Sequence, residues 1–269
     1  MKRYLFIIMV LLPFYLTSCG GDDSTESDYS EESLKKNVEI KVSDEVIGLR
    51  QIVEFSVNYQ TDNPNFLVTW YVDGEKLNSI PRAELSTTWK ANNVGEHLIE
   101  VAITDKEQVL KYQKSINVVE TEFGDAIIGD KKSKIARTFG SAETDDVITY
   151  KQSSVRTYRY YFVNDVLTKI YYEYAVSLTP RNKTDYMIPV TTFSSAYVAH
   201  KEKYGEPVRE NFTQLETSES KIMEYGGHIY SGGMSIQALF QNGTRISEIY
   251  VGPYRSGFGF TYTETLEKR

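Results

Sequence analysis

The sequence has little of several residue types, and each shortage argues against a class of protein. It contains one cysteine and three histidines in 269 residues, so an internal disulfide framework is impossible and a structural zinc site is disfavoured. Acidic residues outnumber basic ones by 37 to 30, whereas a domain that binds nucleic acid through its phosphates normally carries a basic excess. We therefore expect no metal, no cofactor and no nucleic-acid partner.

Sequence signals for catalysis are also scarce. No serine nucleophile elbow, phosphate-binding glycine loop or zincin helix occurs. Adjacent carboxylates such as Asp145 and Asp146 would point to opposite sides of a strand, which disfavours a catalytic pair. His97, His200 and His228 are far apart, and we expect His200 on the solvated face of a helix. The prediction is that the protein is not an enzyme, although acids brought together from distant strands would escape this reasoning.

The amino terminus has the pattern of a secretory signal. Two basic residues, Lys2 and Arg3, precede an apolar run over residues 4–16, which is shorter than the roughly 20 residues of a membrane-spanning helix. The next residues, Leu16-Thr17-Ser18-Cys19, resemble the lipobox of bacterial lipoproteins. That resemblance implies a signal peptide over residues 1–18 and acylation of Cys19, for example with palmitate. Several acyl chains, each contributing about 0.8 kcal/mol per buried CH₂, would hold the chain at a membrane.

Residues 19–36 are predicted to form an acidic, flexible tether after the acylated cysteine. They contain a run of acidic residues that includes Asp22 and Asp23, and they have no apolar cluster. They therefore cannot bury enough apolar surface to become ordered. An acidic run at this place resembles the export signal of Bacteroidetes surface lipoproteins. The resemblance implies an outer-membrane, cell-surface location; a plain solvated spacer is the alternative.

Residues 37–120 alternate between apolar and polar positions in short runs separated by turn signals. Such runs occur at residues 38–42, 52–57, 67–72, 96–103 and 112–119, and several strands without helices predict a β-sandwich. Trp70 followed by Asp73-Gly74, with a later strand ending near Thr104-Asp105, resembles Ig-like domains of the polycystic-kidney-disease (PKD) type. A generic Ig-like sandwich fits equally well. We expect Trp70 in the core, whereas the sequence does not decide whether Trp89 is buried or exposed.

Residues 121–269 differ in that helical patterns appear, at residues 130–140 and 194–205. Both patterns end in an aromatic residue followed by glycine, Phe139-Gly140 and Tyr204-Gly205, and glycine favours the left-handed position that ends a helix. A hairpin follows each helix, over residues 158–176 with a turn at Asn164-Asp165, and over residues 235–251 with a turn at Asn242-Gly243. Asn-Gly favours a type I′ turn. A glycine-rich stretch, residues 225–233, is expected to be a mobile tip or a plain turn.

This order of elements resembles the tandem helix-plus-sheet repeats of the β-lactamase-inhibitor-protein fold, and more distantly the small outer-membrane-assembly lipoproteins. The resemblance implies an α+β domain of two helix-plus-antiparallel-sheet units, residues 121–185 and 186–269; two unrelated units are the alternative. The expected fold is therefore an all-β Ig-like sandwich followed by an α+β domain.

Tyrosine is concentrated in the first of these hairpins. Its side chains must occupy both faces of the hairpin, so one set is expected in the core and the other could present amphipathic rings to a sugar or a protein. High strand propensity of tyrosine, with both faces covered, would explain them equally well. The candidate ligand-binding residues are Tyr158, Tyr160, Tyr161, Tyr171, Tyr172 and Tyr174.

These observations predict a non-catalytic surface lipoprotein that acts as a binding or interaction module at the outer membrane, with a protein or glycan partner. A glycan-binding accessory protein of a polysaccharide uptake system is the first alternative, and a cryptic hydrolase is the second.

Overall fold

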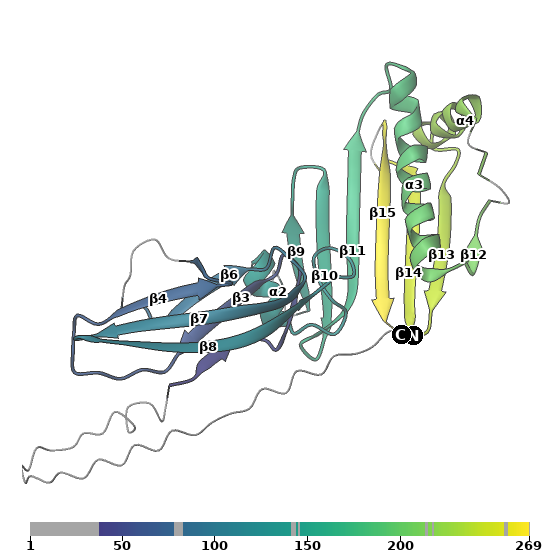
Figure 1. Cartoon of the computed structure of the whole chain (residues 1–269). Coiled ribbons are helices and arrows are strands. Elements are labelled where there is room, and N and C mark those ends of the chain that lie inside the picture. The colour runs from purple at the N-terminus through teal and green to yellow at the C-terminus, as the bar shows by residue number, and fades with distance from the viewer. Residues whose placement is uncertain are drawn as a thin grey trace, which may run out of the picture. The chain divides into compact units, whose positions relative to one another are not determined.

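A computed structural model describes residues 38–77, 83–140, 144, 146–212, 215–216, 218–255 and 258–268. The predicted signal peptide, Cys19 and the acidic tether lie outside the described residues. Within them the chain is mostly β-sheet with three helices (Figure 1).

Residues 40–119 form two sheets that face each other. The smaller sheet has the order β1-β3-β6 and the larger one the order β2-β8-β7-β4-β5. The pairing is antiparallel except between β2 and β8. The strands are β1 (Ile40–Val42), β2 (Val46–Gly48), β3 (Ile52–Val57), β4 (Leu67–Val72), β5 (Glu75–Lys76), β6 (Ser86–Lys90), β7 (Gly95–Asp105) and β8 (Gln108–Val119).

One hydrophobic core lies between these sheets, so this part of the chain is a β-sandwich. Trp70 of β4 and Phe55 of β3 are fully buried there, which confirms the expected place of Trp70. Trp89 of β6 is half-buried and its ring stacks on Phe55 with 6.3 Å between centroids. Asp73 and Gly74 have positive φ angles of 52° and 81° and form the tight turn between β4 and β5 that their sequence indicates.

Residues 147–268 form one seven-stranded antiparallel sheet of order β12-β13-β14-β15-β11-β10-β9. Its strands are β9 (Val147–Lys151), β10 (Arg156–Val163), β11 (Val166–Ser177), β12 (Arg209–Glu210), β13 (Ile236–Asn242), β14 (Arg245–Pro253) and β15 (Gly259–Lys268). The two expected units therefore share a single sheet, because β15 pairs with β11 along its whole length. A structural repeat of the two halves stays a prediction.

Helices α2 (Lys132–Phe139), α3 (Lys183–Tyr204) and α4 (Glu219–Tyr230) all pack on one face of this sheet. The prediction of α2 is confirmed. The prediction that a helix begins near residue 194 is wrong, since α3 begins at Lys183 and contains Pro189. Asn182 caps it by accepting a hydrogen bond from the Asp185 amide at 3.0 Å, which stabilises the start of the helix.

The expectation of a mobile tip or turn at residues 225–233 holds as a turn only at residues 231–232, where Gly232 has a φ of 82°. Tyr225, Gly226, Gly227 and His228 lie inside α4. A Cβ atom added at Gly226 would stand 1.7 Å from the Tyr186 carbonyl oxygen. Gly226 therefore lets the backbones of α3 and α4 approach closely, a tertiary role that outweighs its low helix propensity.

The two hairpin turns differ in type. Asn164 and Asp165 both have positive φ, 50° and 61°, as a type I′ turn requires. In the second hairpin Asn242 still pairs with Arg245, so the loop is Gly243-Thr244 and only Gly243 has positive φ, at 58°. The prediction of a type I′ turn at Asn242-Gly243 is therefore wrong. The buried face of this hairpin is formed by the fully buried residues Ile236, Ala238, Phe240, Ile249 and Val251.

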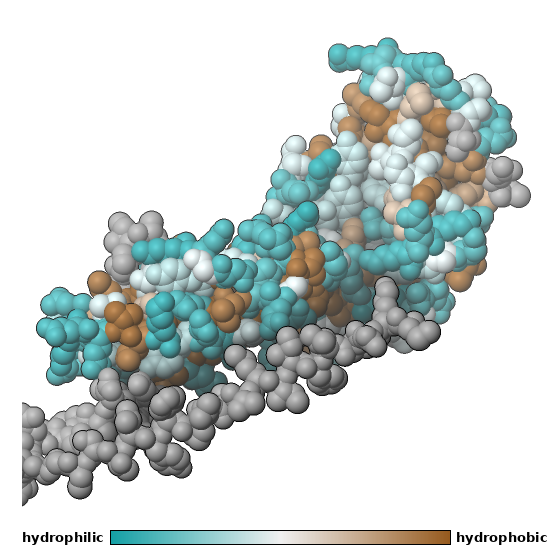
Figure 2. Space-filling view, viewed as in Figure 1, coloured by the Kyte–Doolittle hydropathy of each residue, from teal (hydrophilic) through white to brown (hydrophobic). Residues whose placement is uncertain are grey.

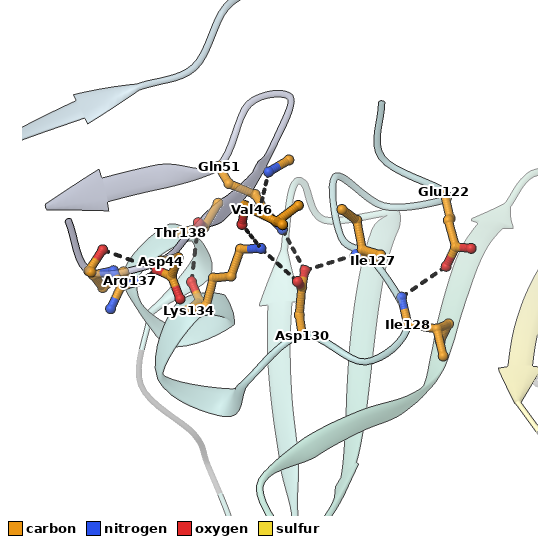
Figure 3. A network of polar contacts seen from close by, with 12 residues as sticks. Asp44, Val46, Gln51, Glu122, Ile127, Ile128, Asp130, Lys134, Arg137 and Thr138 are labelled. Atoms are coloured by element: carbon orange, nitrogen blue, oxygen red, sulfur yellow. Dashed lines mark hydrogen bonds and ion pairs between the residues drawn. The ribbon is translucent and has the colours of Figure 1, made fainter. Parts of the chain in front are cut away.

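Helix α2 joins the sandwich to the sheet through a buried polar network, drawn in Figure 3. Lys134 Nζ donates to Asp130 Oδ1 and to the Val46 carbonyl oxygen, each at 2.7 Å. Asp130 Oδ2 in turn accepts from Gln51 Nε2 at 2.7 Å. Arg137 forms an ion pair with Asp44. These contacts hold the end of the sandwich that carries β2 and β3 against α2, and we call them the interface network.

The visible surface of the described residues is mostly hydrophilic, with the hydrophobic residues in separate patches (Figure 2). In the part of the chain that the structure describes, no helix is long and apolar enough to cross a membrane.

Candidate functional site

The structure distributes the six candidate tyrosines over both faces of the seven-stranded sheet. Tyr158 pairs with Tyr172 and Tyr160 with Ile170 across β10 and β11, and these residues, together with Tyr174, point to the face that the helices cover. Tyr161 and Tyr171 point to the opposite face, because neighbouring residues of a strand alternate. The six candidate tyrosines therefore belong to two surfaces rather than one.

On the open face, Tyr161 and Tyr171 each have a basic side chain close to the ring. Lys169 Nζ lies 5.7 Å from the centre of the Tyr161 ring, and the Arg159 guanidinium lies 5.3 Å from that of Tyr171. Arg159 also pairs with Glu173 at 3.1 Å. Both tyrosines thus already have partners within the sheet, which leaves less of each ring for a ligand.

On the covered face, tyrosines line a pocket of about 440 Å³ that also reaches residues of the sandwich. This volume lies within the roughly 300–1,000 Å³ that small-molecule sites occupy. We call it the tyrosine pocket. Its lining residues are Arg50, Lys90, Gly124, Asp125, Thr138, Phe139, Tyr150, Gln152, Tyr158 and Tyr160.

The floor of the tyrosine pocket is a row of three rings on adjacent strands. The planes of Tyr158 and Tyr160 differ by 12° and those of Tyr150 and Tyr158 by 29°, since the three residues occupy the same face of β9 and β10. Phe139, at the end of α2, stacks on Tyr160 with 4.8 Å between centroids. The result is a row of roughly parallel aromatic rings, of which Tyr150 and Tyr158 are half-buried.

A loop from residue 122 to residue 130 forms one wall. Tyr160 Oη donates to the Gly124 carbonyl oxygen at 2.8 Å. A Cβ atom at Gly124 would lie 2.9 Å from the Tyr158 ring, and the residue has a φ of +59°. Both features require glycine, because a side chain would clash with the ring and strain the backbone.

The rim of the tyrosine pocket carries two cations and one carboxylate. Arg50 Nη1 lies 3.2 Å from Asp125 Oδ1, and both residues have positive φ angles, 67° and 53°. Left-handed backbone costs a non-glycine residue about 1–2 kcal/mol, and such strain is often found beside ligand sites. Lys90 is exposed, and no carboxylate of the described residues pairs with it.

Burial controls the ionisation of the tyrosines on the floor. Burial, followed by the neighbouring Tyr172, raises the pKa of Tyr158 to about 12; burial also raises the pKa of Tyr160 well above its usual range. Both phenols therefore stay protonated at neutral pH and serve as neutral hydrogen-bonding groups. Asp125 is the one carboxylate among the described lining residues, whereas glycoside hydrolysis generally uses two.

His97 and His200 occupy buried positions, whereas His228 is exposed. The expectation that His200 is solvated is wrong: it is 8% exposed, with Nδ1 2.8 Å from the Ala196 carbonyl oxygen and Nε2 3.1 Å from Glu264 Oε1. His97 is 7% exposed and lies 2.6 Å from Asp73 Oδ2. Among the described residues, no group of three or more His, Cys, Asp or Glu side chains could hold a metal ion.

Reasoning from the sequence missed most of the pocket. Arg50, Lys90, Phe139 and Gln152 come from four separate segments, and no local pattern marks their proximity. Tyr150 had a signal, because it lies in the alternating run that forms β9. Of the six candidate tyrosines, only Tyr158 and Tyr160 line this pocket.

No protein-family model and no curated protein sequence matches the chain. Solved structures that resemble it include a fibronectin(III)-like module of Clostridium thermocellum CbhA, with 20% identity over 32% of this chain and 99% of that chain, at a TM-score of 0.27. A quinonprotein alcohol dehydrogenase-like protein from Bacteroides thetaiotaomicron has 14% identity over 51% of this chain and 36% of its own, at a TM-score of 0.24.

A putative phosphatase from Bacteroides thetaiotaomicron has 11% identity over 83% of this chain and 46% of its own, at a TM-score of 0.23. This chain thus spans less than half the length of each of these two Bacteroides proteins. The similarities are too weak to assign an activity.

Proposed function

We propose that the protein is a non-catalytic binding module that a lipid anchor at Cys19 holds at the outer membrane and displays at the cell surface. In this arrangement the acidic tether and an Ig-like or PKD-like sandwich space the α+β part from the bilayer. The observation that carries the binding function is the tyrosine pocket, which combines an aromatic floor with a charged rim.

The composition of the pocket supports binding rather than chemistry. Its described lining residues include no serine, cysteine or histidine, the residue types that most often supply a nucleophile or a general base. A cryptic hydrolase would need a second carboxylate or a bound metal at this position.

The anchor is tested by metabolic labelling with palmitate, comparing the wild type with Cys19→Ala. The wild type is expected to incorporate label and to partition with membranes, whereas the variant should remain unprocessed and unlabelled. Proteolysis of intact cells then reports the leaflet: degradation from outside supports surface display. An unmodified Cys19 thiol on a chain that retains residues 1–18 would contradict the anchor.

A glycan-binding accessory protein of a polysaccharide uptake system is the second candidate, and the row of tyrosine rings on the pocket floor favours it. Aromatic rings offer an apolar stacking surface at low entropic cost, and their hydroxyl groups add polar contacts. Affinity gels with embedded polysaccharides test this candidate. Tyr150→Ala should abolish retardation, whereas Tyr161→Ala, on the open face, is the matched control and should leave it unchanged. Equal retardation of both variants would argue against the pocket.

A further inference from the structure

We propose that the tyrosine pocket binds an acidic saccharide, whose ring lies on the tyrosine floor and whose carboxylate or sulfate group contacts Lys90 and Arg50. The inference rests on the binding function proposed above, since it names the ligand class of the same pocket. Three properties of the pocket carry it: the accessible part of the floor, the charge of the rim and the position of Asp125.

Tyr150 and Tyr158 are the accessible part of the floor. Phe139 already covers one face of Tyr160, which is fully buried. The half-buried rings of Tyr150 and Tyr158 lie 6.4 Å apart between centroids, so a single six-membered ring can touch both. The faces of aromatic rings are electron-rich, and a pyranose presents a face of slightly positive C–H groups to them.

The rim gives the pocket a net positive charge. Arg50 and Lys90 contribute two cations, and Asp125 contributes one anion that Arg50 already pairs with at 3.2 Å. The charge of Lys90 is therefore uncompensated by the described lining residues. A carboxylate or sulfate on the ligand would compensate it through a charge-assisted hydrogen bond, which is about twice as strong as a neutral one.

Asp125 favours a ligand with a single negative charge over a phosphate ester. A nucleotide could also stack on the floor, but its phosphate carries up to two negative charges, and the Asp125 carboxylate would repel the excess. Like charges within about 4–6 Å disfavour each other's ionised form. A uronic acid or a sulfated sugar matches the net charge of the rim more closely.

Isothermal titration calorimetry on the full-length chain tests the inference with two matched probes. Trigalacturonate has one carboxylate on each ring, so the ring on the tyrosine floor brings a single negative charge into the pocket, and its methyl ester keeps the same rings without the charge. We expect trigalacturonate to bind at least about tenfold more tightly than the ester at low salt, with the difference shrinking as salt is raised because ions screen exposed charges. Equal affinity for the two probes would overturn the inference, as would tighter binding of uridine monophosphate or of inorganic sulfate.

Two variants locate the contacts. Lys90→Gln should weaken trigalacturonate binding at least about fivefold and leave the ester unaffected, whereas Lys106→Gln, in an exposed ion pair with Asp62, is the control and should change neither. Unchanged trigalacturonate affinity of Lys90→Gln would overturn the inference. If both probes bind equally and Tyr150→Ala abolishes both, the acidic preference is wrong and the proposed binding function stands. If neither probe binds the folded chain, the saccharide assignment is wrong.

Discussion

At the scale of single residues, charged side chains in this protein form hydrogen bonds to backbone groups as well as to other side chains. Asp73 shows this most directly. Its Oδ2 lies 2.6 Å from His97 Nδ1, and its Oδ1 accepts a hydrogen bond from the Leu98 amide at 2.9 Å. The contact with His97, and then the one with Leu98, lower the pKa of Asp73 below its usual value of 3.8. The ionised carboxylate therefore stabilises the fold.

The pH dependence of stability follows from that shift. Because the folded state binds the Asp73 proton more weakly than the unfolded state, the contribution of Asp73 is present above about pH 4 and is lost as the pH falls through the folded pKa. Asp73 is half exposed, so we expect solvent screening to limit it to about 1 kcal/mol. Asp73→Asn, which tolerates the same left-handed backbone, should lower the free energy of unfolding by this amount at pH 6.

Urea denaturation of the wild type and Asp73→Asn between pH 2.5 and 7 measures the effect. The two curves of stability against pH should converge at the acidic end. Asp62→Asn is the control, because Asp62 lies in an exposed ion pair and should change the stability by less than about 0.5 kcal/mol. A stability difference for Asp73→Asn that persists undiminished at the lowest pH would contradict the role of the ionised form.

At the scale of elements, helix α4 owes its position to a glycine. Gly226 and Gly227 are neighbours in the same helix, but a Cβ atom at Gly226 would collide with the Tyr186 carbonyl oxygen, whereas one at Gly227 would meet nothing within 4 Å. Gly226→Ala should therefore force α3 and α4 apart and cost about 3 kcal/mol. Gly227→Ala should instead stabilise the protein by up to about 1 kcal/mol through helix propensity.

Thermal unfolding followed by circular dichroism separates the two variants. Since they have the same chemistry one residue apart, a decrease in melting temperature for Gly226→Ala and an increase for Gly227→Ala would assign the difference to helix packing alone. Similar shifts in both variants would mean that α4 does not pack against α3 in the way the structure describes.

The same elements show what the sequence could and could not predict. Period-two alternation located β3, β4, β7 and most of the hairpin strands, because one buried face imposes that pattern. It did not reveal α4, whose two glycines lower helix propensity and are explained only by the contact with α3. Strand β15 carries a readable alternation as well, since Phe260, Tyr262 and Leu266 are buried on one face.

The candidate site was harder to predict than the fold. The tyrosines of β10 were recognisable as unusual, but their division between two faces depends on strand register, and a shift of one residue exchanges the faces. Arg50 and Lys90 belong to the sandwich, and their proximity to the tyrosines depends on how α2 packs against it. Local patterns in one sequence do not contain that information.

At the scale of the whole molecule, the interface network couples the sandwich to the seven-stranded sheet. Its central ion pair is almost fully buried, with side-chain exposures of 6% for Lys134 and 7% for Asp130. A second set of contacts lies on the other side of the loop, where Glu122 accepts from Arg245 at 2.9 Å and from the Ile128 amide at 2.9 Å. The ion pair itself lies within the second part, but Lys134 also donates to the Val46 carbonyl oxygen and Asp130 accepts from Gln51, both in the sandwich. Separating the two parts would leave these buried polar groups without those partners, which costs free energy.

This coupling predicts that the two parts unfold together and that removing one cation separates them. Lys134→Met leaves the Asp130 carboxylate buried without its ion-pair partner, which typically costs about 3–5 kcal/mol. Two probes report the parts independently: both tryptophans, Trp70 and Trp89, lie in the sandwich, and the helices of the described residues lie in the second part. Guanidinium titrations followed by tryptophan fluorescence and by circular dichroism at 222 nm should coincide for the wild type and diverge for Lys134→Met.

The exposed pair of Lys106 and Asp62 supplies the matched control for this experiment. Lys106→Met removes the same charge from side chains that are 68% and 87% exposed, so the midpoints of both probes should stay within about 0.5 kcal/mol of the wild type and should still coincide. Divergent transitions already in the wild type would show that the interface network does not couple the parts. Coincident transitions in Lys134→Met, at unchanged midpoints, would show that the buried ion pair contributes nothing to holding α2 against the sandwich, and the tyrosine pocket would then need another support for its cationic rim.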